Sequence, residues 1–88
     1  MKAVHKEPKD VLGYFNRGTE RLNIKDYEGA KEDYSKAIKL HPKFAPAYCT
    51  KGLAKIHLKD KQGAHIDWLK ADKLGYKGAG KLINQYHK

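Results

Sequence analysis

Residues 14–40, YFNRGTERLNIKDYEGAKEDYSKAIKL, return at residues 48–74 as YCTKGLAKIHLKDKQGAHIDWLKADKL, at an offset of 34 positions. The two stretches are identical at 11 of 27 positions. The identical residues of the first copy are Tyr14, Gly18, Lys25, Asp26, Gly29, Ala30, Asp33, Lys36, Ala37, Lys39 and Leu40. A period of this length is typical of stacked structural repeats, because one unit cannot bury its apolar face alone. The repeat therefore favours a binding surface over a reaction site.

The apolar residues within each copy recur three and four positions apart, which is the spacing of amphipathic helices. This spacing predicts an all-α protein with helices near residues 10–24, 27–40, 45–58, 61–73 and 77–86. Asp26 and Asp60 stand where an N-cap carboxylate is needed, at the start of the second helix of each copy. Pro42 is expected to end the second helix, and Pro46 suits the first turn of the third.

Gly18 and Gly52 lie midway along the first helix of each copy. Glycine costs about 1 kcal/mol of helix propensity relative to alanine at such a position, so a packing reason is expected. We predict that the missing side chain lets the second helix approach closely. Tyr34 and Trp68 would then rest against bare backbone.

These residues resemble the tetratricopeptide repeat, a helix-turn-helix unit with aromatic, glycine, alanine and proline residues at fixed positions. The first copy has Tyr14, Gly18, Ala30, Tyr34, Ala37 and Pro42, and the second has Tyr48, Gly52, Ala64, Trp68 and Ala71. Tyr76 stands in the place of the second closing proline. The resemblance implies an α-solenoid of two antiparallel helix pairs and a solvating fifth helix.

The same register divides the chain into parts. Residues 1–9 are an N-terminal extension, and residues 10–88 form a single domain of this type. Within the domain, repeat one covers residues 11–44, repeat two covers residues 45–78, and a capping helix covers residues 79–88.

The chain departs from the commonest pattern of the family on both sides of each glycine, where basic residues replace a leucine and a tyrosine. Each copy also has an aspartate on its second helix, at a position that should lie beside the first helix. We predict the ion pairs Arg17–Asp33 and Lys51–Asp67, with solvated, energetically neutral side chains as the alternative. The residues concerned are Arg17, Arg21 and Asp33, then Lys51, Lys55 and Asp67.

In this family the first helices of successive pairs line a concave face that binds extended peptides or partner helices. By position, the candidate binding residues are Phe15, Asn16, Thr19, Asn23, Cys49, Thr50, Leu53 and His57. Phe15, Leu53 and Ile83 could form an apolar strip with a polar rim. The alternative is that these residues only pack between neighbouring first helices. A known carboxylate clamp of the family is not expected, because its first lysine position holds Phe15.

Composition limits the remaining classes of function. A single cysteine, Cys49, provides no intrachain disulfide and suits a reducing compartment. The sequence shows neither a signal peptide nor the roughly 20 apolar residues of a membrane span, so a soluble cytoplasmic protein is the expectation. The five histidines lack zinc-type spacing, and no nucleophile motif or phosphate-binding glycine loop occurs. No enzyme activity, metal or cofactor is therefore expected.

The leading hypothesis is a non-enzymatic module that binds a protein or peptide, as a monomer or weak homo-oligomer. The formal charge of +9 favours an acidic partner. The main alternative is self-assembly or a scaffold role, through the terminal helix face around Val11, Leu12 and Phe15. Nucleic-acid binding is a weaker alternative, because it needs a continuous exposed basic stripe. That stripe would consist of Arg17, Arg21, Lys51 and Lys55.

Overall fold

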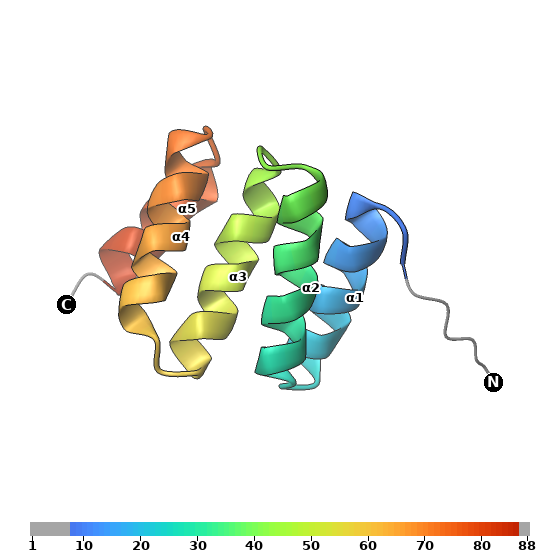
Figure 1. The fold of residues 1–88 in the computed structure, drawn as a ribbon. Coiled ribbons are helices and arrows are strands. Elements are labelled where there is room, and N and C mark those ends of the chain that lie inside the picture. Colours follow the sequence, from blue (N-terminus) through green and yellow to red (C-terminus); the bar gives the residue numbers. More distant parts are fainter. Residues whose placement is uncertain (1–7, 87–88) are drawn as a thin grey trace.

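The computed structural model describes residues 8–86, which form five α-helices and no strand (Figure 1). The helices are α1 (Val11–Asn23), α2 (Tyr27–Leu40), α3 (Ala45–His57), α4 (Lys61–Lys73) and α5 (Lys77–Gln85). Each begins and ends close to the bounds expected from the sequence, and the all-α prediction is confirmed.

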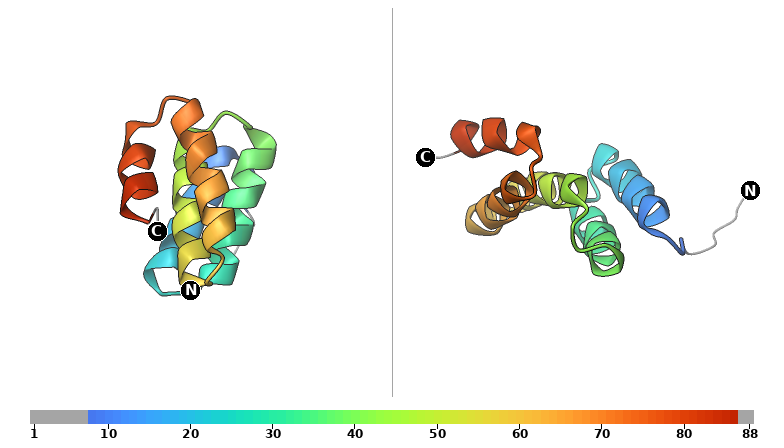
Figure 2. Two further views of the ribbon diagram at one scale, coloured as in Figure 1. Left: turned by 90° about the vertical axis from the view of Figure 1, so that its left-hand side faces the viewer. Right: turned by 90° about the horizontal axis from the view of Figure 1, so that it is seen from above.

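Consecutive helices pack against each other as pairs along the chain, and α1 also touches α3. Seen from above, α1, α3 and α5 lie along one side, while α2 and α4 lie along the other (Figure 2). We call the side formed by α1, α3 and α5 the first-helix face. This arrangement is that of stacked helix pairs with a fifth helix added at the end.

Three of the five helices, α1, α2 and α4, begin at an aspartate side-chain cap. Asp26 and Asp60 each accept a hydrogen bond from the backbone N–H three residues later, at 3.0 and 2.9 Å, which confirms the two predicted N-caps. Asp10 caps α1 in the same way, at 2.8 Å from the Gly13 nitrogen. Since these contacts are local in sequence, the helix bounds could be read from the sequence with little error.

The turns inside the two helix pairs are closed by lysines in the left-handed backbone region. Lys25 has φ 69° and Lys59 has φ 68°. The N–H of Asp26 bonds to the Arg21 carbonyl at 2.7 Å, five residues back, so carbonyls at the end of α1 are satisfied. Glycine usually occupies such a position, and neither lysine marked a turn in the sequence.

One glycine in each helix pair allows its two helices to pack closely, as predicted. A Cβ on Gly18 would lie 2.9 Å from Cε1 of Tyr34, and a Cβ on Gly52 would overlap the indole of Trp68. Both aromatic side chains are fully buried. The Trp68 indole also donates a hydrogen bond of 3.0 Å to the Cys49 carbonyl. Each aromatic ring therefore rests on the backbone of the preceding helix.

The core consists of two clusters, one for each helix pair, and both depend on small residues. The first centres on Tyr34 with buried alanines from α2 and α3. The second centres on Trp68 and includes Ala79 of α5, with Leu82, Ile83 and Tyr86 packed around it. The ring of Tyr86 lies 5.3 Å from that of Trp68. Helix α5 thus covers the last helix pair, as a capping helix should.

Candidate protein-interaction surface

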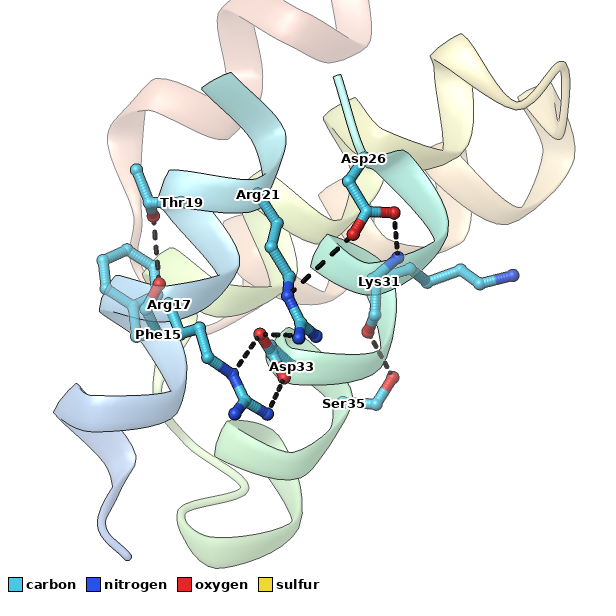
Figure 3. Close-up of polar contacts among 9 residues, drawn as sticks. Phe15, Arg17, Thr19, Arg21, Asp26, Lys31, Asp33 and Ser35 are labelled. Carbon is cyan, nitrogen blue, oxygen red and sulfur yellow. Dashed lines mark hydrogen bonds and ion pairs between the residues drawn. The ribbon is translucent and has the colours of Figure 1, made fainter. Parts of the chain in front are cut away.

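A buried carboxylate joins the two helices of the first pair (Figure 3). Arg17 donates from Nε to Oδ2 of Asp33 at 2.9 Å and from a terminal nitrogen to Oδ1 at 2.8 Å. Arg21 lies 3.3 Å from the same Oδ2, and 3.9 Å from the carboxylate of Asp26. Because Asp33 is only 1% exposed, this is a buried charge paired by two guanidinium groups. The predicted Arg17–Asp33 pair is confirmed.

The second pair of helices uses a different lysine from the one predicted. Lys55, not Lys51, pairs with Asp67, with 2.9 Å between Nζ and Oδ2. Lys55 is the equivalent of Arg21, not of Arg17. The two hydrogen bonds that the planar guanidinium of Arg17 makes to Asp33 therefore have no equivalent at Asp67. The geometry at Lys55 is that of an ion pair without a hydrogen bond, and Oδ2 of Asp67 is buried. The prediction of a Lys51–Asp67 pair was wrong.

Lys51 is half-buried beside charges of its own sign. Burial is the main cause that lowers the pKa of its ammonium, and Lys55 and Lys31 lower that pKa further. Asp67 acts in the opposite direction. Lys31 itself lies 3.3 Å from the carboxylate of Glu28. Asp67 thus offsets part of the effect of burial on Lys51, although its direct ion pair is with Lys55.

Phe15 and Thr19, two candidate binding residues of α1, are largely committed to packing inside the first helix pair. The Phe15 ring lies 5.6 Å from that of Tyr34 and 5.3 Å, edge to face, from that of Phe44. The Thr19 hydroxyl donates to the Phe15 carbonyl at 3.0 Å. It therefore accepts, also at 3.0 Å, from the hydroxyl of Tyr34. Both side chains are partly exposed, but their main contacts are internal.

The candidate binding residues on α3 also make contacts within the protein. Cys49 is 5% exposed, and burial raises the pKa of its thiol. The Thr50 hydroxyl donates to the Pro46 carbonyl at 3.0 Å, and Leu53 packs on the second core cluster. The imidazole of His57 is exposed but stacks on Tyr27 at 4.4 Å, with the rings nearly parallel at 3°. Cys49 is thus not presented to solvent, whereas parts of the other three are.

Asn16 and Asn23 are the candidates most open to solvent on α1. Leu12, which the sequence placed on a possible assembly face, is 59% exposed. Leu12, Asn16 and Asn23 lie four and seven positions apart, so they share one face of the helix. We call these three residues the α1 stripe. It combines one apolar side chain with two amides that can donate and accept hydrogen bonds.

Two exposed apolar residues that were not among the candidates lie on α4. Ile66 is 64% exposed and Leu69 is 48% exposed. Their equivalents in the first copy are Glu32 and Ser35, which are polar. The difference between the two copies was the available signal, because comparison of equivalent second-helix positions would have revealed both residues.

Other kinds of site find no support among residues 8–86. No group of three or more histidine, cysteine or acidic side chains in this range is placed to hold a metal ion. None of the helices in the same range combines the length and hydrophobicity needed to cross a membrane. Two of the histidines, His5 and His87, lie outside the described residues.

Comparison with protein families identifies the type of repeat. Residues 11–44 match the family described as tetratricopeptide repeat, over the range expected for repeat one. A comparison with curated proteins found no similar sequence. The five helices, with the repeated glycine and aromatic contact in α3 and α4, are consistent with tetratricopeptide repeats throughout. Residues 11–44 therefore form a tetratricopeptide repeat, a unit that generally mediates protein–protein interaction.

Proposed function

We propose that the chain is a non-enzymatic module that binds a peptide segment of a partner protein on its first-helix face. The observation that supports this proposal best is the α1 stripe, where Leu12, Asn16 and Asn23 face solvent and take no part in the two core clusters. An exposed apolar side chain beside free amides can anchor a peptide and bond its backbone. Leu53 and Ile83, both partly exposed, extend the proposed surface along α3 and α5.

The charge of the chain indicates the character of the partner. With 19 basic and 10 acidic side chains, an acidic segment would meet the surface faster than a neutral one. Nucleic acid is less suited, because Arg17 and Arg21 both engage Asp33, and Lys55 engages Asp67. Three of the four residues in the proposed basic stripe are therefore already neutralised in part.

The proposal can be tested by capture of partners from a lysate of the source cell. Leu12→Glu combined with Asn16→Glu should abolish capture of a specific partner, because it removes the apolar anchor and repels acidic groups. Leu40→Glu is the matched control, since Leu40 is 53% exposed at the end of α2. It should capture the same partner as the unchanged chain. Equal capture by both variants would contradict a binding site on the α1 stripe.

A further inference from the structure

The outward face of α4 carries a shallow apolar hollow that is largely open to solvent. Its lining residues are Ile66, Leu69, Lys70 and Lys73, around a volume of about 270 Å³. These positions are spaced three, four and seven apart, so they form one continuous helix face. Helix α4 lies on the side opposite the first-helix face (Figure 2). The hollow is thus separate from the surface proposed above.

Packing of the helix pairs does not require apolar residues on this face. Helix α4 meets the rest of the fold through its other side, where Ala64, Asp67, Trp68 and Ala71 are buried. At the equivalent positions of α2, the first copy has Glu32, Ser35, Lys36 and Lys39. The same fold is therefore built in the first copy with no apolar residue at any of the four positions. The fold therefore does not require the exposed apolar side chains of Ile66 and Leu69.

Two lysines beside the hollow, Lys70 and Lys73, favour a ligand with acidic groups. Within the part of the chain that the structure describes, Lys70 and Lys73 have no carboxylate within ion-pair distance. The acidic side chains of α4 are Asp67, which is buried against Lys55, and Asp72. One oxygen of Asp72 lies 3.9 Å from where a Cβ of Gly80 would be, so this side chain points toward α5. The two lysines are free to pair with acidic groups of a partner.

Two other occupants match the hollow less well. A second copy that docked symmetrically would bring Lys70 and Lys73 against their own equivalents, which like-charge repulsion opposes. The segments outside the described residues are mostly basic, with Lys2, Lys6 and Lys88 against one acidic residue, Glu7. A symmetric second copy would thus place lysines against this face, and Glu7 is the single acidic side chain of those segments.

We propose that the outward face of α4 is a second docking surface, for an acidic amphipathic helix of a partner protein. An apolar side chain of that helix would lie between Ile66 and Leu69, and its flanking carboxylates would pair with Lys70 and Lys73. The partner helix would use apolar residues three or four apart as anchors, as amphipathic helices do when they bind apolar surfaces. The chain would then bind partners on two opposite sides.

The test uses a fluorescently labelled peptide of about 18 residues, long enough to be helical when stapled, with leucines on one face and glutamates beside them. Fluorescence anisotropy should show saturable binding to the whole chain. Ile66→Glu combined with Leu69→Ser, which installs the residues of the first copy, should weaken binding at least about tenfold. Lys70→Ser combined with Lys73→Ser should weaken it similarly and reduce its dependence on salt.

The controls decide between this surface and the alternatives. The Leu40→Glu variant should bind the peptide as the unchanged chain does, because Leu40 is exposed at the end of α2 and lies outside both proposed surfaces. A peptide of the same composition in scrambled order should not bind. Three results would each overturn the proposal: no saturable binding of the amphipathic peptide, equal binding by the α4 variants, or tighter binding to vesicles of anionic phospholipid that is lost in those same variants.

Discussion

Gly18 and Gly52 show most directly how single residues set the geometry of this protein. Glycine is a poor helix former, yet at these two positions any side chain would collide with Tyr34 or Trp68. The gain from close packing of a buried aromatic ring outweighs the loss of helix propensity. Gly80 of α5 is not crowded in this way, which allows a direct comparison.

Gly18→Ala should lower the free energy of unfolding by about 1 to 3 kcal/mol, because the added Cβ overpacks the contact with Tyr34. Gly80→Ala in α5 should have the opposite sign, a gain of about 0.5 to 1 kcal/mol, since its Cβ would meet nothing closer than 3.9 Å. Urea unfolding followed by circular dichroism measures both. A gain in stability for Gly18→Ala would show that the contact with Tyr34 is loose.

Lys51 and Lys55, the two lysines near Asp67, should contribute differently to stability. Lys55→Met should cost about 2 kcal/mol, because it leaves the buried carboxylate of Asp67 without its ion-pair partner. Lys51→Met should change stability by no more than about 0.5 kcal/mol at pH 7, or raise it, since it removes a half-buried charge. Equal losses from both variants in urea unfolding would mean that Asp67 depends on both lysines.

The pH dependence of the Lys51 effect follows from the direction of its pKa. Burial holds the pKa of Lys51 in the folded protein below the value of 10.5 for an unperturbed lysine. The cost of burying its charge is therefore fully present below the folded pKa, and it disappears as the pH rises past 10.5. Any advantage of Lys51→Met over the unchanged chain should fade across that range, and unfolding measured at pH 7 and pH 10 would show it.

At the scale of whole elements, α5 has the clearest separate role. The helix adds Leu82, Ile83 and Tyr86 to the cluster around Trp68, and it closes the exposed side of the second pair. Stacked repeats need such a cover, because the last unit has no following neighbour. The nine residues of α5 are too few to form a stable helix alone, so its order depends on this packing.

Leu82→Asp should detach α5 from α4 and cost about 2 kcal/mol, because a partly buried leucine is replaced by a charge. Trp68 is the single tryptophan, and it is fully buried, so its fluorescence emission should shift to longer wavelength. Gln85→Asp is the control, since Gln85 is exposed on the same helix. Unchanged emission in the Leu82→Asp variant would indicate that α3 and α4 bury Trp68 without α5.

At the scale of the whole molecule, the excess of basic side chains opposes self-association. The formal charge is +9, and neither proposed binding surface contains an acidic side chain. Leu12 is exposed on α1, but Phe15, which the assembly alternative also needs, packs on Tyr34 and Phe44. Of the three residues of that assembly face, Leu12 alone is exposed, whereas Val11 and Phe15 are partly buried.

We expect sedimentation velocity to give the mass of a single chain from about 10 to 500 μM at physiological ionic strength, because like charges keep copies apart. A mass that rises with concentration, and that Leu12→Glu restores to the single-chain value, would instead support assembly through α1. Dependence on Ile66 and Leu69 would place the contact on α4.

The sequence alone determined the helices, their pairing and the contacts of both glycines. Helical periodicity, caps and turns act over a few residues, and the 34-residue offset carries each assignment from one copy to the other. Tertiary structure decided which lysine reaches Asp67, that Cys49 is buried, and that Ile66 and Leu69 are left uncovered. These depend on the reach of a side chain and on which faces of neighbouring helices meet. Neither is a local property of the chain, so the scaffold was predictable and much of its surface was not.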